Sequence, residues 1–117
     1  MLTLNKQLRV YYAIPPTDMR KSFDGLIGLV QDHWQLDPLS NALFVFRNRR
    51  GDRVKLLYWD QDGFALWYKR LEQGTFQIPP SNDQPSYVSM SASDLALLLD
   101  GVDLSSIRRR KRYSRAS

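Results

Sequence analysis

The chain has 117 residues, with 17 Lys and Arg against 12 Asp and Glu, a formal net charge of +5 and no cysteine. This length fits one domain with its own hydrophobic core. The lack of cysteine excludes disulfides, cysteine-ligated zinc, iron–sulfur clusters and thiol catalysis. No apolar run approaches the ~20 residues of a membrane helix or forms a signal peptide, so we expect a cytoplasmic protein without a membrane partner.

The first expected elements are a strand and a long helix. Val10 to Ile14 indicates a short strand, which Pro15-Pro16 stops. Thr17 or Asp18 is a suitable N-cap for the helix that follows, and Arg20 is expected to pair with Asp24, four residues on. Apolar residues then recur every three or four positions up to Pro38, which predicts the buried stripe of an amphipathic helix: Met19, Phe23, Leu26, Ile27, Val30 and Trp34.

Residues 43–71 predict a β-hairpin meander of three strands, with turns at 48–52 and 61–63. Side chains alternate between the two faces of a strand, and one parity is apolar throughout. We therefore assign the even-numbered positions to the core face: Phe44, Phe46, Val54, Leu56, Tyr58, Phe64, Leu66 and Tyr68. Keeping these residues on one face requires an odd number of residues in each loop. Gln61-Asp62-Gly63 fits such a loop, with Gly63 in the left-handed position, and Gly51 lies in the first turn.

The odd-numbered positions of the meander divide into a basic half and an apolar half. The basic half lies near the first turn and holds Arg47, Arg49, Arg53, Lys55 and Lys69. The apolar half holds Leu43, Val45, Leu57, Trp59, Ala65 and Trp67. We expect a helix or a partner to cover this apolar half, with Leu57, Trp59 and Trp67 as partner-binding residues. For the two tryptophans, packing is favoured over the alternative of stacking on bases.

The rest of the chain predicts a loop over 72–86, a short strand from Tyr87 to Met90, and a short helix. Ser91 with Asp94 resembles a capping box, and Gly101 is placed to end the helix of Leu95 to Leu99. The predicted fold is α+β, in the order β-α-β-β-β-(β)-α. It has an antiparallel sheet of about four to five short strands, one long helix and one short helix. We expect a single domain over 1–107 and a basic, flexible tail over 108–117.

The positive charge is concentrated in two places. The tail holds six cations and no acid, so the remainder of the chain sums to −1. Within that remainder, Arg47 to Lys55 holds five cations and one acid. Clustered arginines and lysines suit contacts with DNA phosphates, so both clusters are candidate nucleic-acid contacts. With Lys69, the candidate residues are Arg47, Arg49, Arg50, Arg53, Lys55, Lys69, Arg108, Arg109, Arg110, Lys111 and Arg112.

Three blocks of the sequence resemble a known family. They run from Pro16 to Leu26, from Leu43 through Asp60 to Leu71, and, more weakly, from Leu98 to Asp103. Together they resemble the small TnpB-type accessory protein of a bacterial insertion-sequence family, which is encoded as the second open reading frame beside another small protein and a DDE transposase. It is unrelated to the much longer RNA-guided nuclease of the same label. The resemblance implies a role in transposition and supplies no catalytic residues.

The leading hypothesis is therefore a non-catalytic accessory protein that binds the DNA ends of the element. The transposase, the other accessory protein or a second copy of the chain are its candidate protein partners. The alternative is a protein–protein adaptor without DNA contact. A less favoured alternative is a metal-dependent nuclease using Asp60 and Asp62, although aspartates beside a turn glycine more commonly shape the turn. We expect no cofactor, metal site or catalytic residue.

Overall fold

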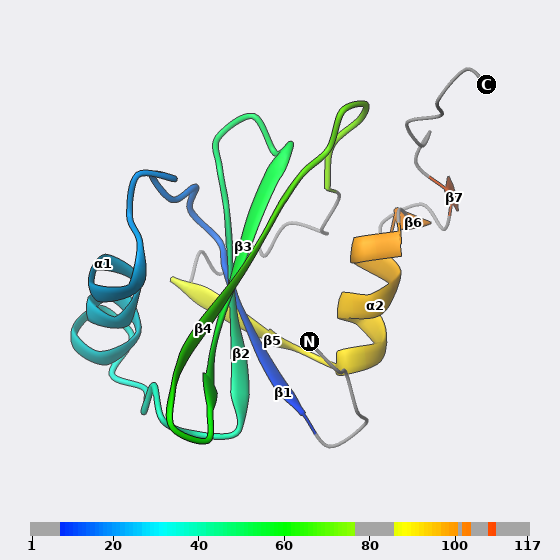
Figure 1. Ribbon diagram of the computed structural model, residues 1–117. Helices are drawn as coiled ribbons and strands as arrows, with labels where there is room; N and C mark the ends of the chain where they lie inside the picture. Colours follow the sequence, from blue (N-terminus) through cyan, green and yellow to red (C-terminus); the bar gives the residue numbers. More distant parts are fainter. Residues whose placement is uncertain (1–7, 77–85, 101, 104–107, 110–117) are drawn as a thin grey trace.

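The computed structural model describes residues 8–76, 86–100, 102–103 and 108–109. Its elements confirm the α+β class (Figure 1). The strands are β1 (Arg9–Ala13), β2 (Ala42–Arg47), β3 (Arg53–Asp60), β4 (Gly63–Arg70), β5 (Tyr87–Met90), β6 (Val102–Asp103) and β7 (Arg108–Arg109). The helices are α1 (Phe23–Gly28), which continues directly into the π-helical segment η1 (Leu29–His33), and α2 (Ala92–Asp100). No helix in these ranges is long and apolar enough to cross a membrane.

The main sheet has five strands in the order β4-β3-β2-β1-β5, and it is mixed rather than antiparallel throughout. The hairpins β2–β3 and β3–β4 form the predicted meander, and β5 pairs antiparallel with β1. β1, however, runs parallel to β2. A parallel pair needs a crossover connection, and the segment that holds α1 and η1 supplies it. This connection places the long helical region against one face of the sheet.

The register of the meander differs from the prediction. Arg47 pairs with Val54, and Asp60 pairs with Gly63, so even-numbered positions face odd-numbered ones across both hairpins. The β3–β4 loop is the two residues Gln61 and Asp62. Gln61 takes the left-handed conformation, at φ 58°, where the prediction placed Gly63. The expected single core face is therefore divided between the two faces of the sheet.

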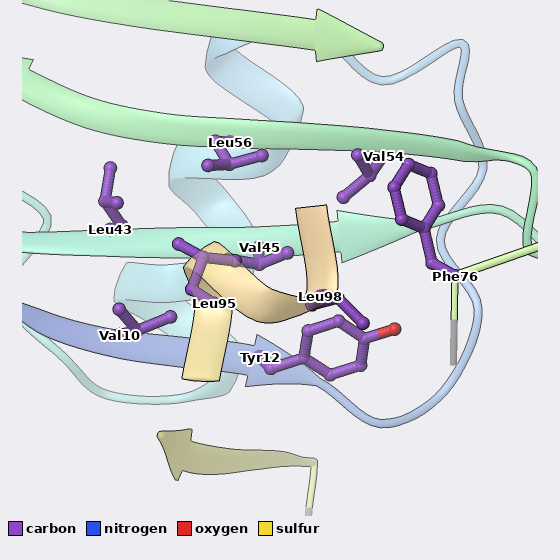
Figure 2. Close-up of a cluster of buried hydrophobic side chains, with 9 residues drawn as sticks. All are labelled: Val10, Tyr12, Leu43, Val45, Val54, Leu56, Phe76, Leu95 and Leu98. Atoms are coloured by element: carbon purple, nitrogen blue, oxygen red, sulfur yellow. The ribbon is translucent and has the colours of Figure 1, made fainter. Parts of the chain in front are cut away.

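Each face of the sheet has its own core and its own helix. Leu95 and Leu98 of α2 cover one face, as Figure 2 shows, together with Val10, Tyr12, Leu43, Val45, Val54, Leu56 and Phe76. Leu26, Val30 and Trp34 cover the other face, together with Ala13, Ala42, Phe44, Phe46 and Leu57. The helices thus lie on opposite sides of the sheet (Figure 1). A strand covered on both faces is apolar at both parities, which explains why parity alone misassigned the core.

The first helix starts later than predicted. Its N-cap is Ser22, whereas the Asp18 side chain accepts hydrogen bonds from the backbone N and the Nε of Arg20, at 2.9 and 3.1 Å. These bonds close a turn ahead of the helix. Arg20 is therefore paired with Asp18, and the predicted pairing with Asp24 is wrong. Phe23, at the first turn, is 41% exposed and falls outside the buried stripe.

The C-terminal part confirms the predicted cap of α2. The Ser91 hydroxyl accepts a hydrogen bond from the backbone N of Asp94, at 3.0 Å. Gly101, the predicted C-cap, lies outside the described residues. The backbones of Arg108 and Arg109 pair antiparallel with β6, although the sequence assigned both residues to the tail. Arg110, Lys111 and Arg112 also lie outside the described residues.

Candidate nucleic-acid interface

A cleft of about 500 Å³ lies between the β2–β3 loop and the segment that leads from β1 towards α1. It brings together two of the blocks that carry the family resemblance. Its lining is Pro16, Thr17, Asp18 and Met19 on one side and Asn48, Arg49, Arg50, Asp52 and Arg53 on the other. The cleft thus contains three of the predicted nucleic-acid contacts, and it adds an opposing wall that the sequence did not predict.

The loop that carries the arginines is held by its own hydrogen bonds. The Asn48 side chain donates to the Asp52 carboxylate at 2.7 Å and accepts from the backbone N of Arg53 at 3.0 Å. Gly51 is left-handed, at φ 78°, and its carbonyl accepts a hydrogen bond from the backbone N of Phe76 at 2.8 Å. A side chain is strained at this φ, which accounts for the glycine. The loop therefore presents its arginines from a fixed backbone.

Arg49 and Arg50 are the exposed cations of the cleft. Within the described ranges, neither guanidinium makes a hydrogen bond or an ion pair. Arg53 is half-buried and donates to the Tyr68 hydroxyl at 3.3 Å. It also lies directly across from Arg70 in the β3–β4 ladder. Like charges in that position are destabilising, so the folded state tolerates a concentration of positive charge here.

Two aspartates balance part of this charge. The hydrogen bonds from Arg20 lower the pKa of Asp18 to about 2. The hydrogen bond from Asn48 lowers the pKa of Asp52. Both carboxylates are therefore ionised at neutral pH, and the lining carries three positive and two negative charges. The positive excess of the cleft rests on Arg49 and Arg50, because their guanidinium groups are exposed.

Arg47 lies beside this cleft but has a structural role. Its Nη2 donates to the Ile14 carbonyl at 2.7 Å, and its own carbonyl accepts from the backbone N of Thr17 at 2.7 Å. These contacts tie the end of β2 to the segment after β1. Burial raises the pKa of Tyr12 to about 12, and the positive charge of Arg47 opposes that rise. Arg47 therefore positions the opposing wall of the cleft.

Lys55 does not belong to the exposed basic surface that the sequence predicted. Its side chain is on the α1 face and the residue is only 6% exposed. Its Nζ donates to the carbonyls of Met19 and Lys21, at 2.7 and 2.8 Å, and lies 4.8 Å from the centre of the Tyr68 ring. A buried ammonium group with these partners is not available to a phosphate. Lys55 instead holds the 19–21 segment against the sheet.

The other predicted contacts do not join the cleft. Lys69 pairs with Val54, so it lies on the α2 face, opposite Arg53 and Lys55. Only the backbones of Arg108 and Arg109 are described, and the rest of the predicted tail contacts are outside the described residues. The structure therefore brings Arg49, Arg50 and Arg53 together and separates them from the remaining candidates.

The three predicted partner-binding residues do not share a face. Leu57 is fully buried on the α1 face, which excludes it from an exposed surface. Trp59 lies on the same face, where it is half-buried and packs edge-on against Phe64, with ring centroids 5.1 Å apart. Trp67 lies on the opposite face against the α2 core. The surroundings of both tryptophans therefore agree with the prediction that they pack within the protein.

Asp60 and Asp62 are exposed on either side of Gln61 at the β3–β4 turn. Among the described residues there is no group of three or more His, Cys, Asp or Glu that could hold a metal ion. A nuclease site at this turn would need further ligands. The turn therefore gives the nuclease hypothesis no support beyond the two carboxylates.

Comparisons with known proteins agree with the resemblance read from the sequence. The family described as "IS66 Orf2 like protein" matches residues 8–109. The uncharacterized protein y4jC of Sinorhizobium fredii is 36% identical over 110 residues, which cover 94% of this chain and 92% of that protein. The uncharacterized protein y4hO of the same organism is 38% identical over 103 residues, 88% of each chain. No solved structure gives a significant match.

Proposed function

Because this chain belongs to the IS66 Orf2-like family of insertion-sequence accessory proteins, we propose that it supports transposition by binding DNA through the cleft beside the β2–β3 loop. The role is non-catalytic. Arg49 and Arg50 contact backbone phosphates, Arg53 supports them from the base of the loop, and the C-terminal cations from Arg110 onward add a second, separate contact. The Lys55 side chain takes no part.

One observation carries this proposal, namely two exposed arginines that have no hydrogen-bond or ion-pair partner among the described residues, on a loop that is already ordered. An arginine without an internal partner keeps its five donors free for a bidentate phosphate contact. The hydrogen bonds of Asn48 fix the loop before any ligand arrives, so less conformational entropy is lost on binding. A non-catalytic protein that positions DNA for a transposase needs contacts of this kind, which fix register without reading bases.

Binding of labelled duplexes by fluorescence anisotropy tests the proposal. The full chain is titrated against an insertion-sequence end and against an unrelated duplex, at several salt concentrations. We expect Arg49→Ala and Arg50→Ala each to lower the slope of log affinity against log salt by roughly 0.9, because each removes about one phosphate contact. The double variant should lose about twice that slope.

Arg9→Ala is the matched control, because Arg9 is exposed on β1 at the end of the sheet away from Arg47. It removes the same charge and should leave the slope nearly unchanged. If Arg9→Ala lowers the salt slope as much as Arg50→Ala does, the slope depends on the net charge of the protein alone. That result would contradict a cleft-specific contact. No binding by the full chain at low salt would contradict DNA binding altogether.

The adaptor without DNA contact is the second candidate function. It is favoured by the exposed Tyr68 and by the half-buried aromatic residues of the β3–β4 hairpin. Co-purification with the transposase and with the other accessory protein, with and without element-end DNA, separates the two functions. An adaptor retains its partner when Arg49 and Arg50 are both changed to alanine and no DNA is present.

A further inference from the structure

Strand β4 forms one edge of the five-stranded sheet and is eight residues long. In the described part of the chain, no strand pairs with its outer side. Figure 1 shows it at the front of the molecule, with α1 and α2 to either side. Proteins commonly protect such an edge with a proline or a bulge, or by keeping the strand short. β4 contains no proline, and Tyr68 on it is 47% exposed.

The two ends of β4 carry opposite charge. Asp60 and Asp62 lie at its start, and Lys69 and Arg70 lie at its end. Among the described residues, the side chains of Asp60, Asp62 and Lys69 make no hydrogen bond or ion pair, and the carboxylate that pairs with Arg70 is that of Glu72, at 2.9 Å. Within the described ranges, the strand therefore offers backbone donors and acceptors along its length, with the unpaired charges of Asp60 and Asp62 at one end and of Lys69 at the other.

We propose that β4 pairs antiparallel with β4 of a second copy of this chain. A two-fold axis perpendicular to the sheet makes the interface self-complementary, so that the acidic start of each strand meets the basic end of its partner. A parallel pairing would bring like charges together at both ends, which is destabilising. The two five-stranded sheets then join into one, and the exposed edge of each is covered.

The dimer has a consequence for the cleft, and this consequence rests on the proposed function. The hydrogen bonds of Lys55 place the 19–21 segment on the α1 face, so a perpendicular two-fold axis puts both clefts on the same side of the joined sheet. A strand of eight residues is ~27 Å long, and the clefts lie at opposite ends of the paired strands. Their separation is then on the order of 30 Å, close to the ~34 Å turn of a DNA duplex.

Sedimentation equilibrium of the full chain, without DNA, tests the dimer. We expect a mass of twice 13.7 kDa that falls to the monomer value on dilution through the micromolar range. Asp60→Lys and Lys69→Glu, two changes on the α2 face, should each weaken dimerisation roughly tenfold or more, because the symmetric interface contains each contact twice. The double variant Asp60→Lys/Lys69→Glu should restore it, because each strand again presents opposite charges to its partner on the same face.

Asp32→Lys is the matched control, since it makes the same change of charge on the exposed side of η1. Far-UV circular dichroism establishes that each variant is folded. A chain that stays monomeric overturns the proposal, and so does a dimer that Asp60→Lys and Lys69→Glu weaken no more than Asp32→Lys does. Because no DNA is present, failure of this proposal is distinguishable from failure of DNA binding.

Discussion

Lys55 is a buried cation whose ammonium group exchanges water for two backbone carbonyls and the face of an aromatic ring. The carbonyls belong to Met19 and Lys21, which lie far from Lys55 in the sequence and next to it in space. Local charge pattern predicted a surface residue, because a lysine among arginines beside a turn is usually solvated. Lys55 is buried because the 19–21 segment lies against it and accepts its hydrogen bonds. The residues next to Lys55 in the sequence give no indication of this contact.

We predict that Lys55→Met lowers the free energy of unfolding by ~2–4 kcal/mol, since it leaves two partly buried carbonyls without their donor. Urea denaturation measures the change. Arg9→Met, which removes an exposed cation on β1, should stay within ~0.5 kcal/mol of the wild type. If Lys55→Met keeps its stability and instead loses DNA affinity, Lys55 is a phosphate contact and its structural role is wrong.

Among the elements, the β3–β4 hairpin shows that the alternation of apolar residues alone does not predict the register of a sheet. The strands, the helices and the turn positions of the meander were predictable, because period and turn residues are local properties. The register was not, since both faces of β2 and β3 are covered and both parities are therefore apolar. Glycine preference then favoured a left-handed Gly63, whereas Gln61 takes that conformation.

We predict that Gln61→Gly raises the free energy of unfolding by ~0.5–1 kcal/mol, because glycine takes φ 58° without the strain that a side chain imposes. The larger conformational freedom of glycine in the unfolded chain reduces part of this gain. Gln61→Ala is the control, since it removes the side-chain amide and keeps the strain. A glycine variant no more stable than the alanine variant would show that the turn is relaxed as it stands.

At the scale of the whole molecule, the net charge of +5 arises from separable parts. Residues 110–117 contribute four cations, and the cleft adds the exposed charges of Arg49 and Arg50. The sequence located both clusters, because charge density is local. It did not show that the segment from Pro16 to Met19 faces the arginines, since that wall is built by the parallel crossover between β1 and β2. Nor did it show that the backbones of Arg108 and Arg109 pair with β6. A truncation that removes the tail and keeps this pairing must therefore end the chain after Arg109.

We therefore predict that ending the chain after Arg109 lowers the salt slope of DNA binding by up to ~3–4, because each of the four lost cations accounts for roughly 0.9. Adding Arg49→Ala and Arg50→Ala to this truncation should lower the slope by roughly a further two, since distant, independent contacts add. A full-length chain with glutamine at the four positions, Arg110, Lys111, Arg112 and Arg115, separates charge from chain length. A slope that the truncation leaves unchanged would assign all of the phosphate contacts to the cleft, and a combined loss smaller than the sum would mean that the two clusters bind the same phosphates.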